Sequence, residues 1–150
     1  MSDHKTRINT LQTMIAGSVI ANDPNYTLIL GEFREVVNVK RITYKNRYRL
    51  LQILHSTRAL DSSLRAFITQ HRYPLGAARP ALGSYLVVLS RNNPPGRMPL
   101  PSAAVARFKT SIVNKRNHYM HAAGAFPAHD DEIKKLLSEM QACLFEVLNL

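Results

Sequence analysis

Apolar residues recur at intervals of three and four along most of the chain, which is the spacing of an amphipathic α-helix. Strict alternation of apolar and polar residues, the pattern of a half-buried strand, is hard to find over a useful length. We therefore predict an all-α fold, an up-and-down bundle of about five or six helices. The predicted helices cover about Thr6–Ala21, Tyr26–Val39, Thr43–Gln70, Leu82–Leu89, Ser102–Arg116 and Asp130 to the C-terminus.

The segment 26–39 is the most ambiguous of these, because Leu28-Ile29-Leu30 and Val36-Val37 would also suit short buried strands. We favour helix. The segment 43–70 contains no Pro or Gly and is expected to be the longest helix. Ser102 is expected to cap the helix that leads to Arg116, and Gly124 and Pro127 to end that segment.

The segment 92–101 contains four prolines and one glycine and cannot continue a helix. It is the one candidate linker, but the parts on either side look too short to fold alone. We interpret it as an ordered crossover inside a single domain that spans residues 1–150.

The last predicted helix begins at Asp130-Asp131-Glu132, whose carboxylates complement the positive end of the helix dipole. Its apolar stripe indicates core packing, with a dimer surface as the alternative. The stripe consists of Ile133, Leu136, Leu137, Met140, Leu144, Val147 and Leu148. The single cysteine, Cys143, cannot form an intrachain disulfide and is expected in the core.

Charge gives the first indication of function. The chain has 20 Lys and Arg against 10 Asp and Glu, a formal net charge of +10, so polyanions are its natural partners. RNA, DNA and anionic membrane surfaces all qualify, and we favour nucleic acid. No apolar run is long enough to span a membrane, and the polar N-terminus lacks a secretory signal, so we expect a cytoplasmic protein.

The segment 115–124, Lys-Arg-Asn-His-Tyr-Met-His-Ala-Ala-Gly, carries the candidate chemistry. An RNA strand supplies its own nucleophile, the ribose 2′-OH, so cleavage needs a base to remove that proton and a cation to stabilise the crowded phosphorane. Histidine, with an ordinary pKa of about 6.5, suits the first task, and a guanidinium that binds two phosphate oxygens suits the second. His121 and Arg116 are therefore the candidate catalytic residues, with Asn117 in an orienting role.

This segment resembles the signature of the HEPN superfamily, an Arg followed by a polar residue and then a His after four to six intervening residues. Arg116, Asn117 and His121 match it, and the position of the motif ahead of the last long helix fits as well. The resemblance implies a metal-independent endoribonuclease without cofactors that leaves a 2′,3′-cyclic phosphate and a 5′-hydroxyl. It further implies a symmetric homodimer and a toxin or effector of a toxin-antitoxin or anti-phage system, with an antitoxin or regulatory protein as a possible partner.

Helix geometry leaves two ways for the motif residues to meet, and the dimer is the one that the resemblance implies. Five residues of a continuous α-helix correspond to a rotation of about 500°, which places Arg116 and His121 roughly 140° apart around the axis. Either the helix loosens before Gly124 or motifs from two chains face one another. In some HEPN toxins a tyrosine two residues after the histidine is modified, and Ala123 occupies that position here, so this sequence does not predict regulation by that route.

Other residues have competing interpretations. Lys115, His118 and Tyr119 are candidate substrate contacts, although Tyr119 also suits packing. His118 and His121, with His129 as a weak third, raise the alternative of zinc, which we do not favour because no carboxylate or cysteine lies at ligand spacing. A basic cluster indicates a solvated helix face, with RNA-backbone contact as the alternative. It consists of Lys40, Arg41, Lys45, Arg47 and Arg49.

Two functional alternatives to the nuclease stay open. The chain could be a non-catalytic HEPN module that binds nucleotide, RNA or a protein through the same basic cleft. It could also be a plain helical interaction domain in which the motif is accidental.

Overall fold

The computed structural model describes residues 3–41, 45–76 and 79–149. Within these ranges it contains helices and no strand, which confirms the all-α prediction and the helical choice for segment 26–39. Seven α-helices lie in the described ranges: α1 (Asp3–Ala16), α2 (Tyr26–Asn38), α3 (Lys45–Gln70), α4 (Leu82–Arg91), α5 (Ser102–Phe108), α6 (Asn114–His121) and α7 (Asp130–Leu148).

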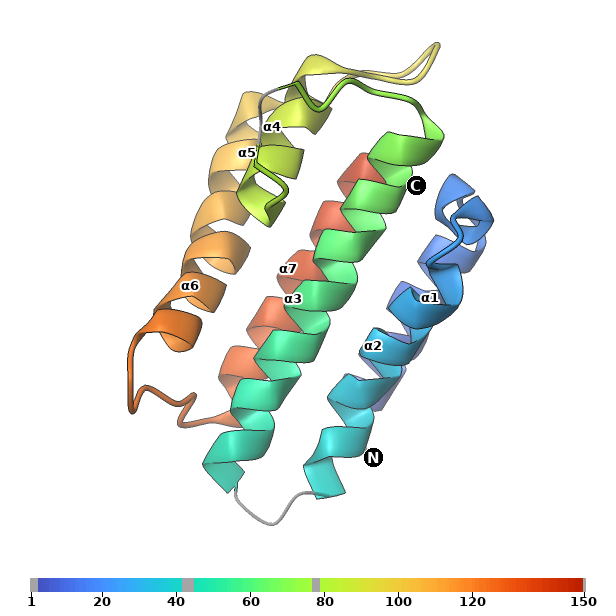
Figure 1. Ribbon diagram of the computed structural model, residues 1–150. Helices are drawn as coiled ribbons and strands as arrows, with labels where there is room; N and C mark the ends of the chain where they lie inside the picture. Colours follow the sequence, from blue (N-terminus) through green and yellow to red (C-terminus); the bar gives the residue numbers. More distant parts are fainter. Residues whose placement is uncertain (1–2, 42–44, 77–78, 150) are drawn as a thin grey trace.

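The helices pack side by side as an elongated bundle with α3 at its centre (Figure 1). Helices α1 and α2 cover one side of α3 and α7, and α5 and α6 run along the other side, with the short α4 at one end. The predicted stripe of α7 is buried along its whole length, and so is Cys143. Core packing is therefore the correct interpretation of that stripe.

Helix α3 is the longest helix, as predicted, and its central position explains its buried polar residues. Ser56, Thr57 and Ser63 are buried, and their hydroxyls donate to carbonyls of α3 itself, so burial leaves no polar atom of these side chains unpaired. Gln52 Nε2 donates to the Val36 carbonyl of α2 at 2.9 Å. Thr43 of the predicted helix lies outside the described residues.

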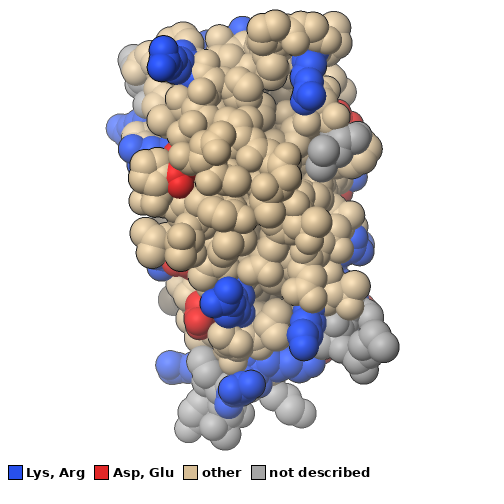
Figure 2. Space-filling view, turned by 90° about the vertical axis from the view of Figure 1, so that its right-hand side faces the viewer, with Lys and Arg blue, Asp and Glu red and all other residues tan. Residues whose placement is uncertain are grey.

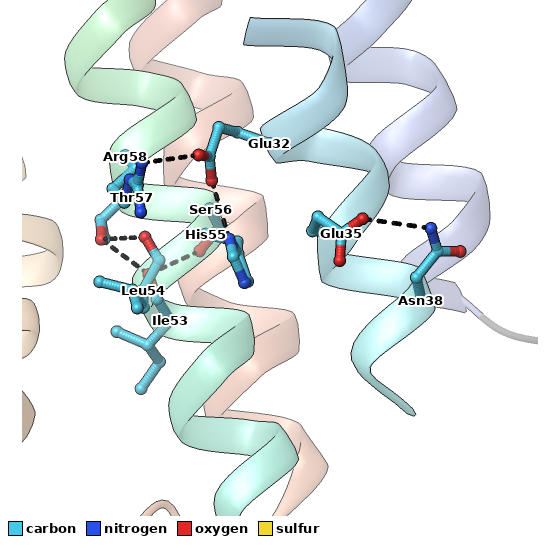
Figure 3. Close-up of polar contacts among 9 residues, drawn as sticks. All are labelled: Glu32, Glu35, Asn38, Ile53, Leu54, His55, Ser56, Thr57 and Arg58. Carbon is cyan, nitrogen blue, oxygen red and sulfur yellow. Dashed lines mark hydrogen bonds and ion pairs between the residues drawn. The ribbon is translucent and has the colours of Figure 1, made fainter. Parts of the chain in front are cut away.

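A charged cluster joins α2 to α3 (Figure 3). One carboxylate oxygen of Glu32 lies 2.8 Å from Nδ1 of His55, and the other lies 2.9 Å from a guanidinium nitrogen of Arg58. His55 and Arg58 lie one turn apart on α3, so a single carboxylate on α2 bridges both. The cluster fixes the register of the two helices.

Two details of the helix ends differ from the prediction. The first helix ends at Ala16 rather than Ala21, because Ser18 caps a separate short 3₁₀ turn, Val19–Asn22, by accepting a hydrogen bond from the Ile20 amide. Ser102 does not cap α5: it is the first helical residue, and Pro101 occupies the extended cap position without a side-chain bond. The segment 92–101 packs against the bundle as predicted, because Leu100 N donates to the Leu89 carbonyl and Arg97 donates to that of Leu148.

The surface over α1 and α2 is largely uncharged at its centre, with Lys and Arg gathered toward the ends of the bundle (Figure 2). Among the basic residues at the end where α2 stops and α3 begins, Lys40, Arg41 and Arg47 are exposed. In the described part of the chain, none of the helices combines the length and the apolar character needed to cross a bilayer.

Candidate functional site

The predicted motif comes directly after an irregularity in its helix. Helices α5 and α6 are joined without a break by a π-helical segment, Lys109–Val113, in which the Asn114 amide donates to the Lys109 carbonyl five residues earlier. Such a segment adds one residue to the helix and rotates the residues after it about the axis, and π segments are frequent at functional sites. The sequence pattern predicted a regular helix here.

A cavity of about 410 Å³ lies between α3, the first turn of α4 and the helix that carries the motif. Lys109, Val113, Arg116 and Asn117 line it at successive steps of four, three and one residues, and these side chains share one side of that helix. Gly83 of α4 closes the opposite side, and a Cβ placed on it would lie 4.0 Å from Cε of Lys109. The cavity therefore brings two cationic side chains, Lys109 and Arg116, to one space.

The first turn of α4 adds hydrogen-bond donors to this wall. The first backbone amides of a helix have no carbonyl partner within it, and the cap residue Ala81 offers no side-chain acceptor. Leu82, Gly83 and Ser84 of this turn line the cavity beside the cationic side chains. The arrangement suits a ligand that carries negative charge.

Arg116 and Asn117 contact each other at this cavity. Arg116 is half-buried, Asn117 is exposed, and Nη1 of Arg116 donates to Oδ1 of Asn117 at 3.2 Å. Around the helix axis Asn117 lies between Arg116 and His121. The Asn117 amide therefore contacts the guanidinium, whereas the predicted orienting role was a hydrogen bond to the His or to the phosphate, and that role stays a prediction.

His121 is the last residue of α6 and is exposed to solvent. Helix α6 stays regular through His121, so the first of the two alternatives, a loosening of the helix that would bring the imidazole round to Arg116, is not seen in this segment. No hydrogen bond joins the two side chains. His121 is not among the residues that line the cavity. The structure brings Arg116 and Asn117 together and leaves His121 one turn further along the helix.

The three candidate substrate contacts occupy different environments. Tyr119 is half-buried and its hydroxyl donates to Glu132 Oε1 at 2.5 Å; burial together with this bond raises the pKa of Tyr119 to about 12. Lys115 Nζ lies 3.7 Å from the same oxygen. His118 is exposed and packs edge-on against the Tyr119 ring at 4.9 Å between centroids.

Two charged residues that line the cavity were not predicted as site residues: Asp61 on α3 and Lys109 in the π-helical segment. Asp61 is the single acidic residue of α3, and its position within an apolar stripe was the available signal. Burial raises the pKa of Asp61, and the positive charges of Arg116 and Arg65 oppose that effect. Lys109 lies seven residues before Arg116, about two helical turns, and this spacing was the available signal.

One member of the predicted basic cluster is not a solvated helix-face residue. Arg49 is half-buried, and its Nε lies 2.9 Å from Oδ1 of Asp130, while its Nη1 donates to the Ala128 carbonyl. The hydrogen bond from Arg49 lowers the pKa of Asp130, so this ion pair joins α3 to the start of α7. The Lys45 side chain lies outside the described residues.

The zinc alternative gains no support from the geometry. Within residues 3–41, 45–76 and 79–149, no three His, Cys, Asp or Glu side chains come together in a way that could hold a metal ion. Comparisons of the chain with protein-family models, with curated proteins and with solved structures found no match.

Proposed function

We propose that the chain is a metal-independent HEPN-type endoribonuclease that acts as a homodimer. The observation that carries the proposal is the cavity in which Arg116 and Lys109 face the uncapped first turn of α4, with Asn117 bonded to the guanidinium. In this proposal the scissile phosphate lies on Arg116, and His121 removes the proton from the 2′-OH or donates one to the leaving 5′-oxygen.

A second copy of the chain completes this site. Arg116 and His121 lie on one regular helical segment, on sides about 140° apart. Asn114, Asn117, His118 and His121 of α6 are exposed, so this side of the helix is available to a second copy. In a two-fold symmetric dimer each surface meets its own equivalent, so His121 of one chain can approach Arg116 of the other.

Cleavage of RNA in EDTA tests the enzyme directly. Purified protein is expected to cleave tRNA or mRNA and to leave 2′,3′-cyclic phosphate and 5′-hydroxyl ends. His121→Ala and Arg116→Ala should each reduce the rate by at least about 100-fold, the usual contribution of such groups. His129→Ala and Arg91→Ala, at exposed positions outside the cavity, are the matched controls. An inactive wild type, or equal activity in the motif variants, would reject the proposal.

Mixing the two inactive variants tests the dimer. If each site takes Arg116 from one chain and His121 from the other, co-expressed Arg116→Ala and His121→Ala chains form some dimers with one intact site. Random pairing should restore about a quarter of the wild-type rate. If mixed dimers form without regaining activity, both residues of a site come from the same chain.

As the resemblance implies, we propose a role as a toxin or defence effector in the cytoplasm, held in check by an antitoxin or regulatory protein. Induced expression in a bacterial host should then arrest growth, and His121→Ala should abolish the arrest without lowering the amount of protein. Continued arrest by the His121→Ala variant would separate toxicity from cleavage.

One observation favours a second candidate, a non-catalytic module that binds RNA or nucleotide. Arg116 and Asn117 line the cavity and His121 does not. A module of this kind would bind RNA with an affinity that falls in Arg116→Ala and is unchanged in His121→Ala, with no cleavage by any variant. Measuring both RNA binding and RNA cleavage with these variants therefore distinguishes the two candidates.

A further inference from the structure

Asp61 is an unusual lining residue for a cavity that attracts anions. Asp61 is half-buried and lines the same cavity as Arg116 and Lys109, and its side chain makes no hydrogen bond or ion pair within the described part of the chain. A partly buried carboxylate generally has partners for its oxygens, because loss of hydration without them is costly. The oxygens of Asp61 are available to a ligand.

The ligand that fits these charges must combine two properties. It must carry negative charge for Arg116 and Lys109, and it must offer hydrogen-bond donors to Asp61, which as a carboxylate only accepts. Inorganic phosphate meets the first requirement and leaves Asp61 facing an added negative charge. A nucleotide meets both, and a cavity of about 410 Å³ lies within the usual range of about 300–1,000 Å³ for small-molecule sites.

The four RNA bases differ in what they offer a carboxylate. Guanine has two adjacent donors, N1–H and the 2-amino group, which match the two oxygens of a carboxylate. The amino groups of adenine and cytosine lie beside an acceptor nitrogen, and the single N–H of uracil lies between two carbonyls, so each sets an acceptor against the carboxylate. Leu82, Val87 and Val113 supply apolar wall around Asp61 for the faces of a base.

We propose that Asp61 is a specificity-determining residue whose carboxylate binds the N1–H and 2-amino group of a guanine while Arg116 and Lys109 hold the 3′-phosphate of the same nucleotide. This inference rests on the proposed function and deepens it. Attack by the 2′-OH uses the nucleotide's own ribose, so fixing both the base and the 3′-phosphate of that nucleotide also fixes the nucleophile. The substrate class is RNA with guanosine on the 5′ side of the scissile bond.

Calorimetric titration of the full-length protein with nucleoside 3′-monophosphates tests the assignment. The wild type should bind guanosine 3′-monophosphate at least about tenfold more tightly than the adenosine, cytidine and uridine compounds, and inosine 3′-monophosphate, which lacks the 2-amino group, should lie between. Equal binding of the guanosine and inosine compounds would overturn the proposal, and this comparison requires no substitution in the protein.

A complementary substitution sharpens the test. Asp61→Asn presents one acceptor and one donor, which match the N1–H and 2-carbonyl of xanthine, so preference should move from guanosine to xanthosine 3′-monophosphate. Asp131→Asn, an exposed position on α7 outside the cavity, is the matched control and should keep the guanosine preference. Unchanged selectivity in a folded Asp61→Asn variant would overturn the proposal.

The two proposals fail in distinguishable ways. Guanosine-selective binding by a wild type that cleaves no RNA would support Asp61 and reject the nuclease. Cleavage of RNA that depends on His121, occurs equally after every base and is unaffected by Asp61→Asn would support the nuclease and reject the role of Asp61.

Discussion

Glu132, in the first turn of α7, ties the segment after the motif to the rest of the bundle. One of its carboxylate oxygens accepts from the Tyr119 hydroxyl of α6 at 2.5 Å and lies 3.7 Å from Lys115 Nζ. The other accepts from the Ala128 amide at 2.9 Å. We predict that Glu132→Gln, which keeps the shape of the side chain and removes its charge, lowers the free energy of unfolding.

The magnitude can be worked out from these contacts. Hydrogen bonds to a charged group contribute about 1.5–3 kcal/mol and neutral ones about 0.5–1.5 kcal/mol, so weakening the Tyr119 bond costs about 1 kcal/mol. When the glutamine oxygen keeps the Tyr119 bond, its nitrogen faces the Ala128 amide and cannot accept from it, and losing a bond of this capping type costs about 1 kcal/mol more. The Glu132 side chain is 28% exposed, so solvent screens part of its charge. We therefore expect the total loss in the free energy of unfolding to be about 2 kcal/mol and no larger.

Urea unfolding at neutral pH measures this loss, with Asp131→Asn as the control. Asp131 is exposed and is next to Glu132 in the first turn of α7, and its substitution removes the same charge from the helix N-terminus. Subtracting the effect of Asp131→Asn therefore leaves the contribution of the specific bonds. Equal losses in the two variants would refute the reasoning, because the helix dipole alone would then account for both.

The pH dependence of the same variant gives a second check. The hydrogen bond from Tyr119, with smaller contributions from the Ala128 amide and Lys115, lowers the pKa of Glu132 below its ordinary value of 4.5. Its stabilisation is therefore complete above pH 4.5 and is lost as the pH falls through the lowered pKa. The stabilities of wild type and Glu132→Gln should converge in acid, and a constant difference would contradict the assignment.

Two further predictions concern single positions outside the site. Gly31 lies in α2, and an added Cβ would meet no atom within 4 Å. Gly31→Ala should therefore raise the free energy of unfolding by about 0.5–1 kcal/mol. A lower free energy of unfolding in urea would contradict this prediction. Cys143 is buried, and burial raises its pKa to about 12. Ellman's reagent should therefore detect no thiol in the native protein and one thiol after denaturation. A rapid reaction with the native protein would contradict this and show that this part of the core opens.

The predictions that succeeded depend on patterns local in sequence. The apolar stripe of α7 is buried as the 3.6-residue period requires, and the absence of Pro and Gly from 45–70 permits the long α3. An apolar stripe identifies the buried side of a helix, but it does not show which other helix packs against that side. The sequence therefore predicted that a bundle forms and where most of its helices lie.

The features that the sequence did not reveal depend on contacts between distant segments. Arg49 pairs with Asp130, which lies 81 residues away in the sequence. The run of basic residues alone therefore does not distinguish Arg49 from an exposed neighbour such as Arg47. The π-helical segment 109–113 was not predicted either, because the apolar spacing there suits a regular helix. The sequence shows Asp61 as an acidic residue in an apolar stripe. It does not show that the fold brings Asp61 close enough to Arg116 for their charges to interact.

The geometry of α6 links the candidate chemistry to the oligomeric state. Five residues of regular helix separate Arg116 from His121 by about 7.5 Å along the axis and by about 140° around it, so the two side chains leave α6 in different directions. Because α6 has no buried residue and Phe126 in the loop after it is 38% exposed, this side of the bundle can accept a second copy without rearrangement of the core. If the motif is catalytic, we therefore expect activity to require dimerisation through α6.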